Sequence, residues 1–318
     1  MKLSDIFVND AGRLRSGWRF AVFIALYLLL FILVSFILFG LNRVISDVYV
    51  SAIIFAAISF LIAAIAGWVC NRLLEELPWR ALGWTFNNRW KRDILSGVLI
   101  GSLSLLLAAC IALLGGKLRF VLNFTGLYQP IIKTLFSSLA VFIPSAAAEE
   151  MLFRGYPLQT FARAHLAWVG LFLTSVPFAL VHLGNPNVVL IFTFINTALA
   201  GVWLAVAYLK TRSLWLPLAI HFSWNWTMNA IMGIPVSGIT EFAPAPLFRA
   251  IDSGPAWLTG GDYGLEGGAA CTLALLVSTI FIWRARFLKP SEEMLRLTSN
   301  ENPKRRDSVS FYDRHDVD

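Results

Sequence analysis

Eight long apolar runs are the feature of this sequence that most limits its fold. Each is close to the roughly 20 residues that an α-helix needs to cross the hydrocarbon core of a bilayer. Only 14% of the 318 residues are charged, whereas a soluble domain has about a quarter. These features exclude a soluble enzyme, a secreted disulfide scaffold and a disordered chain. They predict an all-α, polytopic transmembrane bundle of about eight spans. The runs are Trp18–Leu41, Val48–Cys70, Ile94–Gly115, Ile131–Ala148, Leu166–Leu183, Val188–Leu209, Leu214–Gly233 and Ala269–Leu288.

The basic residues predict the orientation of the spans. If both termini are cytoplasmic, 21 of the 26 Lys and Arg residues lie in inner segments and 5 in outer ones, as the positive-inside rule requires. The same rule explains the net charge of +7 without a nucleic acid as partner. The first run is too long for a signal peptide and lacks a cleavage site, so we expect a retained anchor.

The expected organisation has three parts. A cytoplasmic segment covers residues 1–17, a transmembrane helical domain covers 18–288, and a polar, disordered cytoplasmic tail covers 289–318. Such a chain is expected to be a multi-pass protein of the cell (plasma) membrane, with the lipid bilayer as its surroundings.

Ionisable residues at the end of the fourth run form the first candidate site. Glu150 and Arg154 are four residues apart, with the acid first, which favours an ion pair on one helix. The adjacent Glu149 points about 100° away around the helix and is free to face a cavity. Taken alone, these charges are also typical of a helix end that meets the lipid headgroups.

Two histidines inside apolar runs form the second and third candidate sites. His182 shares a helical face with Phe178, and His221 shares one with Asn225. A lone polar residue in a span is often interfacial or joins two helices by a hydrogen bond. Because an intramembrane ionisable group is costly, several of them together indicate a functional site.

A carboxylate, two imidazoles and an amide are suited to hydrolysis. A desolvated Glu gains basicity and can take a proton from water. Imidazole and carboxamide groups can stabilise the oxyanion of a tetrahedral intermediate. The sequence contains neither G-x-S-x-G nor H-E-x-x-H, so serine-hydrolase and zincin motifs do not explain these residues.

At these residues the sequence resembles the CPBP (Abi) family of intramembrane proteases, which includes type II CAAX prenyl endopeptidases and bacteriocin-processing or bacteriocin-immunity proteins. The family motifs E-E-x-x-x-R, F-x-x-x-H and H-x-x-x-N occur in order as Glu149-Glu150…Arg154, Phe178…His182 and His221…Asn225. The resemblance covers roughly residues 130–232.

The resemblance implies an endopeptidase that cuts a protein or peptide substrate in the membrane, such as a CAAX-type chain. It implies that Glu149 and His182 activate the attacking water, that His221 and Asn225 form the oxyanion hole, and that Glu150 and Arg154 support the first helix. The family is traditionally grouped with metalloproteases, so Zn²⁺ held by Glu149, His182 and His221 is a possible cofactor. We favour a mechanism without an obligatory metal.

Two features need an explanation from the structure. Simple spans place Glu149 and His182 at depths that differ by on the order of 10–15 Å. Either the fourth helix continues past Glu149 toward Pro157 or the fifth helix is kinked and tilted. We favour the first, because residues 151–153 remain apolar. The Gly-rich loop over 260–268 could be a lid, although a flexible turn is the simpler interpretation.

Two other functional classes stay open at this point. The chain could be a non-catalytic membrane module, such as an immunity protein or scaffold, in which the motifs only join helices. It could also be a transporter with Glu149 and the histidines as a proton relay, although the absence of repeat symmetry counts against a transporter.

Overall fold

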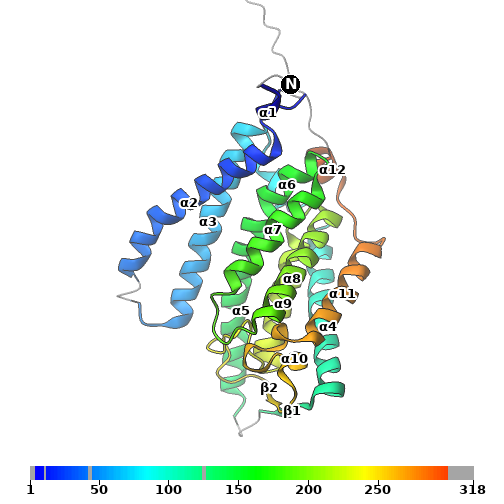
Figure 1. Ribbon diagram of the computed structural model, residues 1–318. Coiled ribbons are helices and arrows are strands. Elements are labelled where there is room, and N and C mark those ends of the chain that lie inside the picture. Colours follow the sequence, from blue (N-terminus) through cyan, green and yellow to red (C-terminus); the bar gives the residue numbers. More distant parts are fainter. Residues whose placement is uncertain (1–3, 11, 42–44, 124–126, 300–318) are drawn as a thin grey trace, which may run out of the picture.

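The computed structural model describes residues 4–10, 12–41, 45–123 and 127–299. Most of these residues are helical, and the long helices form one bundle (Figure 1). The α-helices are α1 (Ser4–Phe7), α2 (Ser16–Leu41), α3 (Val48–Leu74), α4 (Trp90–Gly116), α5 (Gln129–Glu150), α6 (Tyr156–Arg163), α7 (Ala167–His182), α8 (Leu190–Thr211), α9 (Trp215–Trp226), α10 (Ala256–Thr259), α11 (Ala269–Arg284) and α12 (Glu292–Thr298). Short 3₁₀ turns are η1 (Trp79–Leu82), η4 (Gly261–Tyr263) and η5 (Leu265–Gly267), and π-helical turns are η2 (Met151–Gly155) and η3 (Thr227–Ile231).

Every one of the predicted apolar runs contains a helix, and the long helices indicate a multi-pass integral membrane protein. Five of these helical stretches are long and apolar enough to cross a membrane, and the helices over Ala167–His182 and Ala269–Arg284 are apolar but shorter. The span count of about eight therefore stays a prediction. The five are Ser16–Phe36, Val48–Leu74, Trp90–Gly115, Gln129–Arg163 and Leu190–Thr211.

The fourth helical rod continues well past Glu149, as the sequence predicted. Helix α5, the π turn η2 and α6 follow one another without a break over Gln129–Arg163. Pro157 does not end the rod, because it lies in the first turn of α6, where proline removes no essential hydrogen bond. The extension places Glu149 inside the rod instead of at its end.

A small two-stranded sheet lies at one end of the helical bundle (Figure 1). Strands β1 (Leu118–Leu122) and β2 (Phe248–Asp252) pair antiparallel, with Leu118 opposite Asp252. The chain is mostly helical, and the all-α prediction did not include this pair of strands. The strands are only five residues long and far apart in sequence, so no local pattern reveals their pairing.

The segment after the last long helix is partly ordered, which corrects the expectation of a disordered tail from residue 289. Helix α12 begins after Ser291, whose side chain caps it by accepting from the Met294 amide. Met294 is fully buried and Glu293 pairs with Arg80 at 3.0 Å. Residues 300–318 lie outside the described part of the chain.

The two ends of the described chain lie at the same end of the bundle. Helices α1, α6 and α12 gather there, whereas β1, β2 and α10 lie at the opposite end (Figure 1). This arrangement agrees with termini on one side of the membrane. That the side is cytoplasmic stays a prediction from the basic residues.

Helix α9 packs closely against α4 because two glycines of α4 face it. A Cβ on Gly97 would lie 2.5 Å from the Ala219 Cβ, and one on Gly101 would overlap Ser223. Glycines at this four-residue spacing let two backbones approach closely inside a membrane. The contact fixes α9, which carries His221 and Asn225, against a long helix.

Candidate active site

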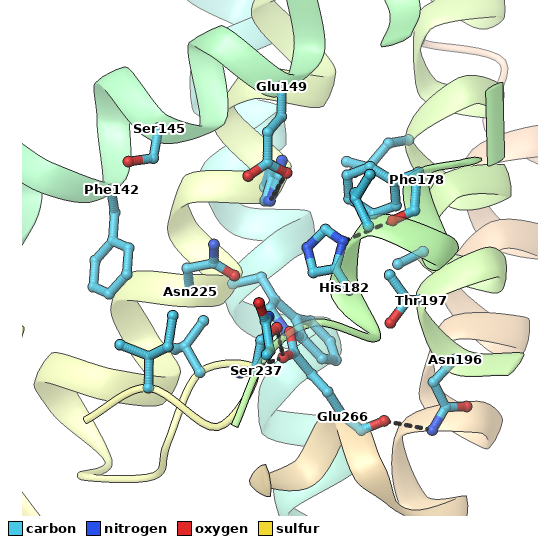
Figure 2. A pocket seen from close by; sticks show the side chains of 18 of the residues that line it. Phe142, Ser145, Glu149, Phe178, His182, Asn196, Thr197, Asn225, Ser237 and Glu266 are labelled. Carbon is cyan, nitrogen blue, oxygen red and sulfur yellow. Dashed lines mark hydrogen bonds and ion pairs between the residues drawn. The ribbon is translucent and has the colours of Figure 1, made fainter. Parts of the chain in front are cut away.

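A cavity of about 390 Å³ lies between α5, α7, α8, α9 and the loops that follow α9 and α10. Glu149, His182, His221 and Asn225 all line it. Figure 2 shows Glu149 pointing into the cavity from α5, His182 facing it from the end of α7, and Asn225 facing it from α9. The structure therefore brings together the four residues that the sequence predicted as catalytic.

A buried ion-pair network supports this group from behind. The Glu150 carboxylate is fully buried and accepts from Arg154 Nη1 at 3.1 Å and from His221 Nδ1 at 2.9 Å. Arg154 also donates to the Gly201 carbonyl at 3.2 Å. Arg154 thus contacts both the Glu150 carboxylate of α5 and the backbone of α8. The bond to Glu150 determines which ring nitrogen of His221 carries a proton. The sequence predicted the Glu150–Arg154 pair and missed the bond to His221.

Glu149 is placed differently from its neighbour. Its side chain is 36% exposed, and its Oε2 lies 3.8 Å from His221 Nε2. Because Nδ1 of this ring is bonded to Glu150, Nε2 is the nitrogen that faces the cavity acid. Glu149 therefore has a nearby imidazole and open space, and no Lys or Arg of the described chain forms an ion pair with it.

His182 is oriented by its own helix. Its Nδ1 lies 2.7 Å from the Phe178 carbonyl oxygen, and because a carbonyl can only accept, Nδ1 is the donor. In the neutral ring, Nε2 is then an acceptor that can bind water in the cavity. The Phe178 ring is 3% exposed and lies 4.6 Å from both the His182 ring and the Arg154 guanidinium. The pattern F-x-x-x-H therefore combines a packing residue with a polar one.

Asn225 and Asn229 lie one turn apart in sequence, but they do different things. Asn225 is half-buried, lines the cavity and makes no side-chain hydrogen bond within the described ranges. Asn229 is buried and donates to the Ile234 carbonyl at 3.2 Å, which fastens the end of the helix. Asn229 therefore supports the end of this helical rod and is not among the residues that line the cavity.

Two of the three helices that carry the motifs, α5 and α9, continue into a π turn close to the site. Turn η2 directly follows Glu150, and η3 begins two residues after Asn225. A π turn adds one residue to a helical turn and often occurs at functional sites. No periodic pattern in the sequence predicts these two turns.

The candidate zinc ligands do not gather as a metal site. No group of three or more His, Cys, Asp or Glu side chains in the described ranges is arranged to hold a metal ion. Glu149 Oε2 and His221 Nε2 lie 3.8 Å apart, and His182 does not form a group with them that could hold a metal. The donor set does not fit Zn²⁺, which in a catalytic site has three protein ligands at about 2 Å.

Several residues of the cavity were missed from the sequence. Glu266 of the Gly-rich loop accepts from Trp224 Nε1 at 2.9 Å and from the Ser237 amide and hydroxyl at 2.8 and 2.7 Å. Asn196 of α8 donates to the Glu266 carbonyl at 2.8 Å. Asn196 is a single amide within an apolar run, which was a usable signal. The loop is folded into short helical turns that line the cavity, and it is not a simple flexible connection.

Comparison with known families agrees with this geometry. Residues 131–227, which begin in α5 and end just after Asn225, match the family model of type II CAAX prenyl endopeptidases, Rce1-like. Residues 131–227 form an Rce1-like domain. This domain contains all four cavity residues and the Glu150–Arg154 pair, whereas Ser237 and Glu266 lie outside it. No curated protein and no solved structure matches the chain. The matched stretch covers less than a third of the 318-residue chain.

Proposed function

We propose that the protein is an intramembrane endopeptidase that hydrolyses a peptide bond of a membrane-associated substrate through a water activated by Glu149. The observation that carries the proposal is that one acid, two imidazoles and one amide from α5, α7 and α9 line a single cavity of about 390 Å³. Such convergence is expected of hydrolytic machinery, whereas residues that only join helices would each face a neighbouring helix.

In the proposed reaction, Glu149 and the Nε2 of His182 hold the attacking water. Glu149 takes a proton as the water oxygen attacks the substrate carbonyl. The same acid then delivers that proton to the leaving amine, so that its protonation state is restored after one turnover. The 36% exposure of its side chain gives a water molecule access to it.

His221 and Asn225 stabilise the oxyanion in this proposal. With Nδ1 bonded to Glu150, Nε2 of His221 can donate only if the ring carries both protons. Two carboxylates with one arginine leave a negative charge that such a ring balances. Asn225 supplies a second donor from its unengaged amide.

The proposal extends to substrate and location. The substrate is a protein or peptide presented by the membrane, and a CAAX-type chain is the class that the family name suggests. The distribution of basic residues favours a protein of the cell membrane with both termini in the cytoplasm.

The experiment uses Glu149→Gln as a trap. We expect this variant to retain its fold and capture substrate that mass spectrometry can identify, and the native chain to cleave the captured protein in detergent. Glu292→Gln is the matched control, because the Glu292 side chain is 92% exposed and far from the cavity. If the native chain and Glu149→Gln leave every captured protein equally intact, the chain is a non-catalytic membrane module.

A further inference from the structure

Glu266 is a second carboxylate in the active-site cavity, and the proposed hydrolysis does not use it. It lies in η5, beyond the Rce1-like domain, and enters the cavity from the side opposite Glu149 (Figure 2). Its side chain accepts three hydrogen bonds, from Trp224 and from two groups of Ser237. All three donors are neutral, so they hold the carboxylate in place without balancing its charge.

The basic groups that line the cavity in the described chain are the imidazoles of His182 and His221. Among the described residues no Lys or Arg lines it, whereas two glutamates do, and the one nearby arginine, Arg154, is already paired with Glu150. Apolar and aromatic side chains form most of the remaining wall. Negative charge within such a low-dielectric wall attracts a cation strongly.

One acceptor position of Glu266 is available for a ligand. A carboxylate has about four lone-pair positions, and the observed donors take one on Oε1 and two on Oε2. The side chain is half-buried, so it is neither sealed from the cavity nor surrounded by bulk water. A substrate ammonium group could therefore reach Oε1 while the existing bonds persist.

We propose that Glu266 is a specificity-determining residue that receives a basic side chain or a free amine of the substrate. The role of Glu266 in specificity rests on the proposed endopeptidase function, whereas the binding of a cation by Glu266 can be measured without it. Peptides with a cationic residue in this subsite are preferred over neutral ones, and peptides with a carboxylate there are disfavoured.

A binding experiment tests the subsite without requiring catalysis. Hexylammonium is the probe and hexan-1-ol is its uncharged control, and the shift of the thermal unfolding midpoint of the full chain in detergent reports binding. We expect a larger shift with hexylammonium in the native chain and in Glu149→Gln, and about tenfold weaker binding in Glu266→Gln, because a charge-assisted bond is lost.

Ser237→Ala distinguishes the effect of the Glu266 charge from the effect of the hydrogen bonds that hold its side chain. It removes one hydrogen bond to the same carboxylate but leaves the carboxylate charged, so we expect it to retain hexylammonium binding. Equal shifts from both probes would overturn the proposal. So would binding that is lost in Glu149→Gln and kept in Glu266→Gln, or lost equally in Glu266→Gln and Ser237→Ala.

Cleavage then tests the role in specificity. Peptides derived from a captured substrate place one Lys or one Gln at each of three positions on either side of the cleaved bond. At one position, the ratio of kcat/KM for Lys over Gln should fall about tenfold in Glu266→Gln. A ratio does not depend on how much enzyme is folded. A constant ratio at all positions would refute the specificity role, whereas failure of the native chain to cleave any peptide would refute the proposed function and leave the binding result valid.

Discussion

Two buried clusters of charge lie along one helical rod, and they are built in opposite ways. In the first, Glu75 is fully buried and pairs with Arg19 at 3.1 Å and with Arg163 at the end of α6. In the second, Glu149 and Glu150 share the middle of the rod, where Glu150 is fully buried and Glu149 is 36% exposed.

The two clusters differ in how completely their acids are paired, and this difference separates a structural role from a chemical one. Glu75 has two arginine partners, does not line the cavity and has no room for a ligand. It joins α2, α3 and α6 at one end of the bundle, where removing one partner would leave an uncompensated charge. Glu149 has open space and one imidazole beside it instead of two arginines. A costly buried acid whose pairing is complete indicates assembly, and one left incomplete beside a cavity indicates function.

The largest expected effect is on the activity of a Glu149 variant, which a Glu75 variant should not share. Glu149→Gln should lower kcat by about 10³-fold, because a general base is worth roughly 10²–10⁴, while the thermal unfolding midpoint stays close to that of the native chain. Cleavage of a captured substrate and thermal unfolding in the same detergent are the two measurements. A variant with near-native kcat would remove Glu149 from the reaction.

The reverse behaviour is expected of the other acid. Glu75→Ala should lower the free energy of unfolding by about 3–5 kcal/mol, because the buried Arg19 and Arg163 lose the carboxylate that balances their charge. Activity per folded molecule should be retained. Glu76→Ala is the control: its side chain is 55% exposed in its pair with Arg13, so the expected loss is below about 1 kcal/mol.

A third variant tests the amide. Asn225→Ala should lower kcat by about 10²-fold with little change in KM, as expected for the loss of an oxyanion donor. The comparison is Asn229→Ala on the same rod, which removes the bond to the Ile234 carbonyl and should lower stability more than activity. The opposite pattern would assign Asn229, instead of Asn225, to the reaction.

The smallest expected effect is for Glu150, which is part of a buried ion pair and also supports the residues of the cavity. Glu150→Gln keeps the shape but weakens the bonds to Arg154 and His221. We expect kcat to fall about 10–100-fold, which is typical when a supporting partner of an active group is lost, together with a measurable loss of stability. If only stability changes, Glu150 belongs with Glu75 and not with the site.

The sequence predicted much of this organisation because membrane physics acts locally. Apolar runs gave the long helices, and the apolar residues 151–153 correctly predicted the continuation of the fourth rod. The Glu150–Arg154 pair followed from helical spacing alone. The family match over residues 131–227 agrees with the motifs that carried the resemblance.

What could not be predicted depends on contacts between distant segments. The pairing of β1 with β2, the bond from His221 to Glu150 and the approach of Glu266 to Trp224 each join residues more than forty positions apart. The burial of Met294 in α12 likewise depends on a surface formed elsewhere, so a polar tail looked disordered. Spacing along one helix contains no information on such partners.

The π turn at Met151–Gly155 lies between Glu149 and Arg163 on the rod that serves both clusters. A π turn accommodates its extra residue with little rotation of one end of the rod relative to the other. A residue inserted or deleted in the α-helical parts of the rod would instead turn the two ends by about 100°. The cavity acid and the anchoring arginine could then no longer both point correctly, so a change of length should be tolerated at the π turn and not in the α-helical parts that flank it.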